Sequence, residues 1–172
     1  MLSIHYLYRL IEDFIFEGPL VRYKLGENYC GAASGPLYAT EGAAGCDLVS
    51  SAEVTLAPGE TALVSTGLFL EIPEGYEMQV RSRSGMALKK NLIVLNSPGT
   101  IDSDYRGEVK VILKNLSAVH HKVERGDAVA QGVFARVPRA KFMITSELSS
   151  TKRGEGGFGS TGVKRQDAQG RS

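Results

Sequence analysis

Residues 92–113 read LIVLNSPGTIDSDYRGEVKVIL, and their pattern sets the class of the fold. An apolar run at 92–95 is followed by the turn-forming sequence Asn-Ser-Pro-Gly and, from residue 108, by apolar residues that alternate with charged ones. Alternation with a period of two is typical of a β-strand that buries one face. We therefore expect strands at 92–95 and 108–113, joined by a hairpin-like excursion at 96–107.

Short β-rich runs that end in turn signals recur along the chain from residue 44 onward. The turn signals are the segments 57–60, 72–75, 96–99, 105–107 and 124–127. A second evenly spaced apolar run follows at 129–137. Turns at this frequency favour an all-β sandwich, jelly roll or barrel over a parallel α/β sheet. One short helix is predicted at 84–90, with Ser84 available to cap it, and the apolar spacing from Ile4 to Ile15 indicates a possible short N-terminal helix.

The composition excludes several classes of protein. With 20 Lys and Arg against 19 Asp and Glu, the net charge is +1, so no global field favours nucleic acid or an anionic membrane. Two cysteines, Cys30 and Cys46, and three histidines are too few for a disulfide framework or a Cys/His zinc site, which favours a reducing compartment. No apolar run approaches the ~20 residues of a membrane-spanning helix. We expect a soluble, cytoplasmic protein with neither nucleic acid nor membrane as a partner.

The last 24 residues differ in composition from the rest of the chain. Six of them are glycines, and only Phe158, Val163 and Ala168 are apolar. So few apolar groups cannot offset the cost of ordering the backbone, about 1–2 kcal/mol per residue. We expect residues 1–148 to form a single β-domain, in which 1–20 are a possible N-terminal extension, and residues 149–172 to be a flexible tail.

Functional side chains are densest at 96–107, and two interpretations of this segment are open. In one, it is a polar turn in which Asp102 and Asp104 bond their own backbone. In the other, Asp102 is a general base held between Ile101 and a turn, and Tyr105 faces a ligand.

Two further clusters suggest anion binding. Around Arg153 and Phe158, glycines let backbone N–H groups converge on an anion, and hydroxyl donors follow at Ser160 and Thr161. The alternative is a polar tail with an incidental aromatic. Arg83, placed before the predicted helix, marks a possible phosphate site that is weak evidence by itself.

Five motifs in order resemble those of the homotrimeric dUTP pyrophosphatase (dUTPase) family. They are Glu41-Gly-Ala-Ala-Gly-Cys-Asp-Leu48, Arg83-Ser-Gly-Met-Ala87, the segment 96–107, the segment 125–131 with Arg-Gly-Asp and Gln131, and the segment 153–162. The resemblance implies a distorted jelly-roll β-barrel that forms a homotrimer, with active sites at subunit junctions. It also implies Mg²⁺ as cofactor, and hydrolysis of dUTP to dUMP and pyrophosphate, which lowers dUTP and supplies dUMP for thymidylate synthesis.

The resemblance also implies a role for individual residues. Asp102 would deprotonate the attacking water, Tyr105 would pack under the deoxyribose, and Asp47 would hold a water of the magnesium shell. The uracil and deoxyribose slot would be lined by Asn96, Gly99, Thr100, Ile101, Asp102 and Lys110. The phosphates would be bound by Arg83, Ser84, Gly85 and Gln131. The tail would close over the nucleotide with Arg153, Phe158, Gly159, Ser160 and Thr161.

Two other functions are kept as alternatives. One is a dCTP deaminase of the same fold, which would need a proton shuttle beside the base; the hairpin from Asp102 to Tyr105 favours hydrolysis instead. Zinc-dependent deamination is excluded by the missing Cys and His ligands. The other is a trimeric nucleotide-binding module without catalysis, which the presence of both Asp102 and the tail motif disfavours.

Overall fold

The computed structural model describes residues 18–33, 35–158 and 160. The chain divides into two compact units, Met1–Pro138 and Arg139–Ser172. Every strand lies in the first unit, together with the one helix of the described residues. The N-terminal helix expected between Ile4 and Ile15 lies outside the described residues. No helix in the described part of the chain is long and apolar enough to cross a membrane.

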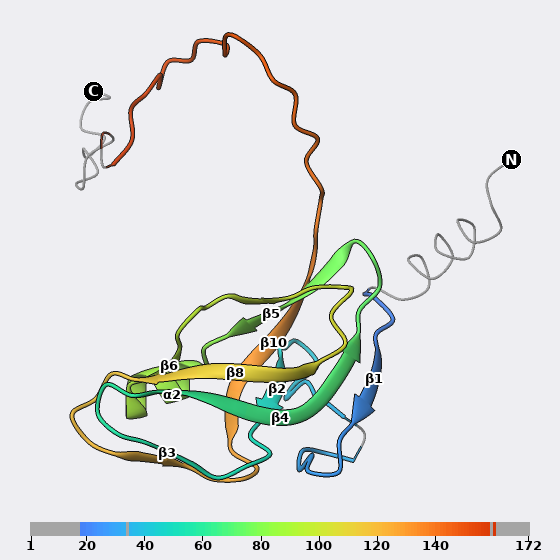
Figure 1. Ribbon diagram of the computed structural model, residues 1–172, viewed down its shortest axis with the longest axis vertical. Coiled ribbons are helices and arrows are strands. Elements are labelled where there is room, and N and C mark those ends of the chain that lie inside the picture. Colours follow the sequence, from blue (N-terminus) through green and yellow to red (C-terminus); the bar gives the residue numbers. More distant parts are fainter. Residues whose placement is uncertain (1–17, 34, 159, 161–172) are drawn as a thin grey trace, which may run out of the picture. The chain divides into compact units, whose positions relative to one another are not determined.

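Two four-stranded antiparallel sheets form the first unit, as the turn pattern predicted (Figure 1). One has the order β1-β4-β8-β6, and the other has the order β2-β10-β5-β7. A ribbon of β3 and β9 completes the strands. The strands are β1 Arg22–Leu25, β2 Cys46–Val49, β3 Val54–Leu56, β4 Thr61–Glu71, β5 Tyr76–Arg81, β6 Leu92–Val94, β7 Gly99–Ile101, β8 Glu108–Asn115, β9 His121–Val123 and β10 Ala128–Arg136.

The core lies between the two sheets, and β8 shows how the sequence builds it. Val109, Val111 and Leu113 are fully buried, while the residues between them lie on the outer face. The alternation in the sequence therefore predicted the faces of this strand correctly. Strand β6 ends at Val94, one residue earlier than expected, although the Leu95 N–H still donates to the Ile112 carbonyl at 2.8 Å.

The expected helix is present as α2 Ser84–Lys90, but its predicted cap is wrong. Arg83, with extended backbone, is the N-cap residue, and no side chain caps the helix. Ser84 already lies inside the first turn, so its hydroxyl is not placed to accept the first amide hydrogens. At the other end Asn91, in the left-handed region, closes the helix through its backbone N–H.

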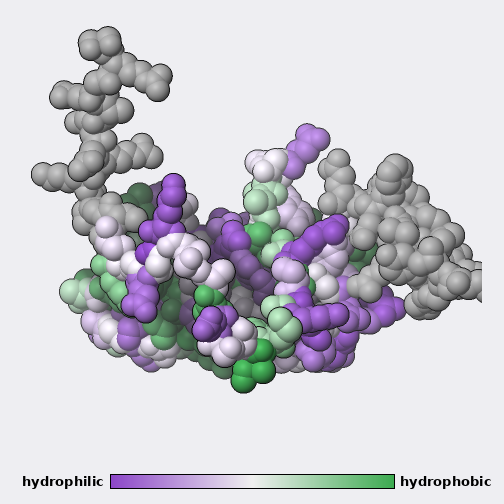
Figure 2. All heavy atoms as spheres, turned by 90° about the horizontal axis from the view of Figure 1, so that it is seen from above, coloured by the Kyte–Doolittle hydropathy of each residue, from purple (hydrophilic) through white to green (hydrophobic). Residues whose placement is uncertain are grey.

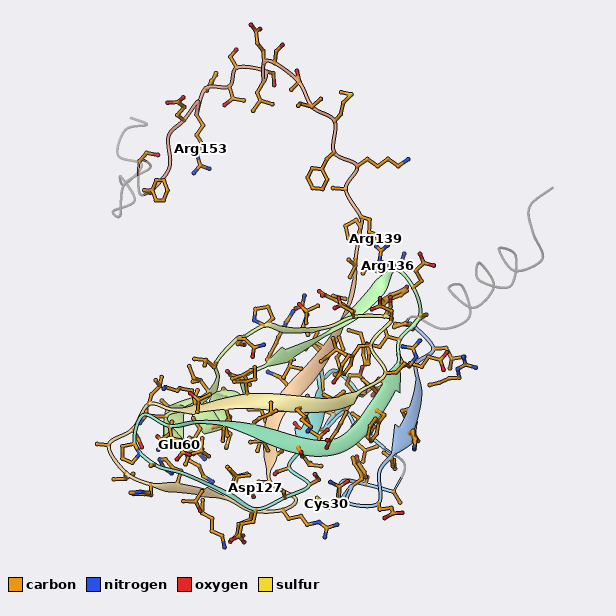
Figure 3. All side chains as sticks on the ribbon, viewed as in Figure 1. Cys30, Glu60, Asp127, Arg136, Arg139 and Arg153 are labelled. Carbon is orange, nitrogen blue, oxygen red and sulfur yellow. The ribbon has the colours of Figure 1, made fainter. Side chains whose placement is uncertain are left out.

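The predicted turns are closed by glycines and by carboxylates. Gly59, Gly75 and Gly126 all have positive φ angles, which glycine adopts without strain. In two of these turns a carboxylate accepts a backbone N–H: Glu60 from Ala57 at 2.7 Å, and Asp127 from Glu124 at 3.1 Å. Both carboxylates are labelled in Figure 3.

Asn115 ties the end of β8 to the connection between β3 and β4. Its side chain is fully buried, and its amide N–H groups lie 2.8–3.1 Å from the carbonyl oxygens of Leu56, Ala57 and Val119. Its amide oxygen accepts the backbone N–H and the hydroxyl of Ser117. Few residue types could satisfy so many buried backbone groups at once.

Replacing Asn115 with alanine should therefore destabilise the protein. We expect a loss of about 2–4 kcal/mol in the free energy of unfolding, because the carbonyl groups stay buried without a donor. Urea unfolding at fixed protein concentration measures this, with Thr61→Ala, an exposed change on the neighbouring strand, as the control. Equal midpoints for the two variants would contradict the role of Asn115.

Candidate functional site

Three of the predicted site residues meet on the second sheet. The Arg83 Nε atom lies 3.3 Å from the Asp47 Oδ1 atom, and the Arg83 guanidinium donates to the Ala128 carbonyl at 2.8 Å. The Gln131 amide donates to the Ser82 carbonyl at 3.1 Å, which holds the residue next to Arg83. We call Asp47, Arg83 and Gln131 the phosphate cluster, because the resemblance implies that Arg83 and Gln131 bind phosphate.

The pairing of β10 with β2 and with β5 explains why these residues lie close together. Asp47 on β2 lies directly opposite Gln131 on β10, and Gln131 lies opposite Arg81 at the end of β5. Cys46 and Leu48 are buried, so Asp47 between them projects from the outer face of the sheet. Burial raises the pKa of the Cys46 thiol, so the group beside Asp47 stays uncharged at neutral pH.

Ser84 and Gly85 follow the phosphate cluster at the start of α2, and both are exposed. Arg83 is held at its guanidinium by a carboxylate and a carbonyl, and two of its nitrogen atoms are used. Its remaining N–H groups can still donate to an anion, because a guanidinium carries five.

Two residues of the predicted pyrimidine slot, Asn96 and Gly99, lie close together. A Cβ atom at Gly99 would lie 3.0 Å from the Asn96 amide nitrogen, so Asn96 packs directly on the Gly99 backbone. Gly99, Thr100 and Ile101 form β7, which pairs with β5. The cis peptide bond between Ser97 and Pro98 precedes this strand. The structure thus brings these predicted residues together along one backbone segment.

Asp102 follows β7 and is exposed. The Tyr105 backbone N–H donates to the Asp102 carbonyl at 3.2 Å, and the Arg106 guanidinium donates to the Ser103 and Tyr105 carbonyls. A backbone hydrogen bond and the Arg106 side chain therefore close the turn. Among the contacts of the described residues, none engages the Asp102 or Asp104 carboxylate, so the polar-turn interpretation gains no support.

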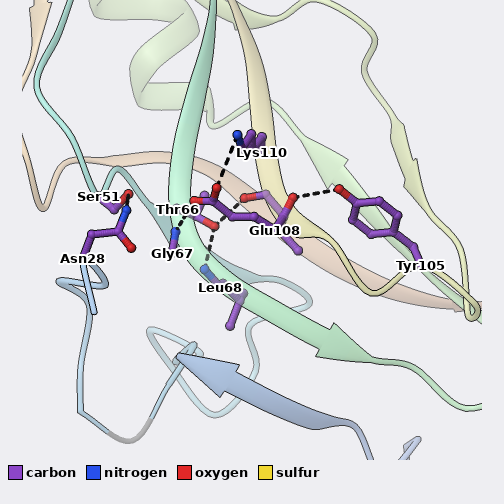
Figure 4. Close-up of polar contacts among 9 residues, drawn as sticks. Asn28, Ser51, Thr66, Gly67, Leu68, Tyr105, Glu108 and Lys110 are labelled. Atoms are coloured by element: carbon purple, nitrogen blue, oxygen red, sulfur yellow. Dashed lines mark hydrogen bonds and ion pairs between the residues drawn. The ribbon is translucent and has the colours of Figure 1, made fainter. Parts of the chain in front are cut away.

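Tyr105 and Lys110 both contact Glu108, a residue for which the motifs in the sequence predict no role (Figure 4). The Tyr105 hydroxyl donates to the Glu108 carbonyl at 3.0 Å, and the Lys110 Nζ atom lies 3.4 Å from the Glu108 Oε2 atom. No sequence pattern indicated these contacts of Glu108, because an outward-facing glutamate at the start of a strand is common on the surfaces of β-sheets.

The tail residues that the structure describes make local contacts only. The Arg153 Nε atom donates to the Gly156 carbonyl at 2.7 Å, and the Ser160 N–H donates to the Gly157 carbonyl at 2.9 Å. Phe158 has a positive φ angle and its ring is fully exposed. Gly159 and Thr161 lie outside the described residues. Arg153 is labelled in Figure 3.

The phosphate cluster and Lys110 lie on different outer faces of the first unit. Asp47 and Gln131 project from the second sheet, whereas Lys110 projects from the first, because its neighbours Val109 and Val111 point into the core. The two sheets share that core, so their outer faces point in different directions. On the side of the molecule that Figure 2 draws, hydrophilic and hydrophobic residues are intermixed.

Comparison with known proteins identifies the family. The sequence model of dUTPase matches residues 32–162. The chain belongs to the dUTPase family. It is 53% identical over 130 residues to the deoxyuridine 5'-triphosphate nucleotidohydrolase of Helicobacter pylori, a match that covers 76% of this chain and 90% of the relative. The enzyme of the same description from Hydrogenobaculum is 55% identical over 130 residues, which cover 75% of this chain and 90% of the relative.

Solved dUTPase structures share the fold. The dUTPase of Staphylococcus bacteriophage 80alpha with dUPNHPP superposes with a TM-score of 0.76 at 28% identity, over 84% of this chain and 99% of that one. A mutant dUTPase of phage phi11 of S. aureus, whose structure shows the coordination of a structural Mg(II) ion, has a TM-score of 0.69 at 25% identity, over 76% of this chain and 99% of that one. The expected jelly-roll-like fold and the expected activity, hydrolysis of dUTP, are therefore confirmed.

The geometry of the phosphate cluster predicts the effect of replacing Arg83. If Arg83 binds a phosphate of the substrate as expected, Arg83→Ala should lower kcat/KM for dUTP by about 10²-fold, because a charge-assisted contact would be lost. Arg83→Lys should recover only part of this loss, since an ammonium group lacks the planar fork. Steady-state kinetics measure both variants, with Arg136→Ala at the far end of β10 as the control. Unchanged kcat/KM in folded Arg83→Ala would contradict the assignment.

Proposed function

We propose that this dUTPase cleaves dUTP between the α- and β-phosphates by attack of a water that Asp102 deprotonates. The observation that carries the proposal is the Asp102 carboxylate at the end of β7. It is exposed beside the predicted nucleotide slot, and none of the described residues forms a hydrogen bond or an ion pair with it. A carboxylate of this kind is available to accept a proton from a bound water.

The slot residues would select the base and the sugar. Backbone donors and acceptors of Gly99, Thr100, Ile101 and Asp102 would pair with the edge of uracil, and Asn96 would close the end of the slot. The methyl group of thymine would be excluded by volume and cytosine by unmatched polarity. Tyr105 would pack under the deoxyribose, where a ribose hydroxyl would find no room, and Lys110 would complete the opposite wall.

The phosphate cluster would bind the triphosphate. Arg83 keeps free N–H groups while Asp47 and the Ala128 carbonyl hold it in place, which supports a preorganised anion site. Ser84 and Gly85 would add a hydroxyl and backbone donors, and Gln131 would contact a phosphate while it orients the preceding Ser82. Preorganised donors stabilise the charge that develops as the bond breaks.

The residues present fit a magnesium ion that arrives with the substrate. The described residues contain no group of three or more His, Cys, Asp or Glu side chains placed to hold a metal. Asp47 is a single half-exposed carboxylate next to Arg83, which suits contact with the ion through a water. When bound, Mg²⁺ would neutralise phosphate charge and favour departure of pyrophosphate.

We infer that the active form is a homotrimer with shared sites. The phosphate cluster and Lys110 project from different outer faces of one subunit, which supports a site completed by a second copy. Arg153, Phe158, Gly159, Ser160 and Thr161 would close over the nucleotide, with Phe158 on the uracil and the others at the γ-phosphate. The exposed ring of Phe158 supports such a lid. We place the enzyme in the cytoplasm, and its two free cysteines support a reducing compartment.

Replacing Asp102 with asparagine should lower turnover by about 10²–10⁴-fold, because the amide cannot accept the proton of the water. Release of pyrophosphate from dUTP, dCTP, dTTP and UTP, each with and without magnesium, measures the effect and the substrate preference together. Asp104→Asn in the same turn is the matched control and should stay close to the unsubstituted enzyme. Near-normal turnover in folded Asp102→Asn would remove Asp102 from the role of base.

A variant that lacks residues 150–172 should fold and assemble but retain little activity, because it loses the lid and not the core. Mixed with Asp102→Asn, it should regain activity in hybrid trimers, where one subunit supplies Asp102 and another supplies the tail. Native mass spectrometry measures subunit exchange beside the kinetic assay. Exchange without recovered activity would contradict shared sites, and full activity of the truncated variant by itself would contradict the lid.

A further inference from the structure

Glu108, the first residue of β8, connects three parts of the protein. Its side chain is only 17% exposed although it lies on the outer face of the sheet. Its Oε1 atom accepts the Gly67 N–H at 2.8 Å, its Oε2 atom lies 3.4 Å from the Lys110 Nζ atom, and its carbonyl accepts the Tyr105 hydroxyl (Figure 4).

Gly67 needs the carboxylate because β4 is irregular at this point. The register of β4 against β8 shifts between Ser65 and Leu68, so the Gly67 N–H leaves the regular hydrogen-bond ladder. A Cβ atom at Gly67 would lie 2.9 Å from the Tyr29 backbone, and its φ angle is +70°. Crowding by the Tyr29 backbone thus favours glycine at this bulge. The Glu108 carboxylate supplies the acceptor that the Gly67 N–H requires.

The same bulge holds the backbone at the start of β8 from the other side. The Thr66 hydroxyl donates to the Val109 carbonyl and accepts the Leu68 N–H at 3.2 Å. The Gly67 carbonyl accepts the Gly26 N–H at 2.8 Å. The position of Glu108 is therefore set by a braced segment of β4.

We propose that Glu108 is a positioning residue for selection of the sugar. Its carboxylate, fixed by the Gly67 N–H, holds the start of β8, whose carbonyl orients the Tyr105 ring and whose outer face carries Lys110. This inference rests on the proposed function, in which Tyr105 packs under the deoxyribose. Displacement of the ring would make room for a ribose hydroxyl, because rejection by volume depends on a fixed wall.

Four variants test the proposal, with kcat and KM measured for dUTP and UTP. Glu108→Ala should lower the ratio of kcat/KM for dUTP to that for UTP by about tenfold, mainly through a gain in UTP hydrolysis and a higher KM for dUTP. Glu108→Gln retains an oxygen that can accept the Gly67 N–H and should keep most of the selectivity. Glu53→Ala removes a carboxylate from another surface ion pair, with Lys122, and is the matched control.

Hydrogen exchange of the segment 102–110 provides a readout that needs no substrate. Glu108→Ala should speed exchange there, while Glu53→Ala should not. Unchanged exchange in this segment, or unchanged selectivity in folded Glu108→Ala, would overturn the proposal. Tyr105→Ala separates the role proposed for Tyr105 from that proposed for Glu108. If it lowers selectivity and Glu108→Ala does not, the role of Tyr105 stands and that of Glu108 fails. If neither variant lowers it, the assignment of Tyr105 to the sugar fails and the Glu108 proposal fails with it.

Discussion

The two-residue period of β8 is the constraint on which the rest of the structure depends. Val109, Val111 and Leu113 fill the space between the sheets, and this packing fixes the register of β8 against β4 and β6. The same register assigns Glu108 and Lys110 to the outer face. Burial of the apolar side chains, each of which stabilises the fold by roughly 1.5–3 kcal/mol, therefore also determines that Glu108 and Lys110 face outward.

Patterns that depend on neighbours in the chain could be predicted from the sequence. The strand at 108–113, the turns at glycine and the helix at 84–90 all follow from local preferences, and the structure has each of them. The cap of α2 could not be predicted, since any of several residues around Ser84 can occupy that position and tertiary contacts of Arg83 decide between them. Similarly, no local pattern predicted a role for Glu108, because the N–H group that its carboxylate binds belongs to Gly67, 41 residues away in the chain.

The two parts of the candidate site are assembled from the chain in different ways. The phosphate cluster is built across strands, so that Asp47, Arg83 and Gln131 come from three distant segments and only the fold brings them together. The predicted pyrimidine slot comes instead mostly from one continuous segment, 96–102, to which Lys110 of β8 is added, and it stays a prediction. This difference explains why the segment 96–107 stood out in the sequence, with two interpretations left open, whereas Arg83 by itself was weak evidence.

The register of β8 also restricts how this family can change during evolution. A single inserted residue within 108–115 would turn the core side chains outward and the slot side chains inward, and so would destroy both together. Changes in length must therefore accumulate in loops, and the segment between β1 and β2 is one such place. The family match begins at residue 32, inside that segment, so β1 lies before the matched residues although it pairs with β4 in the first sheet.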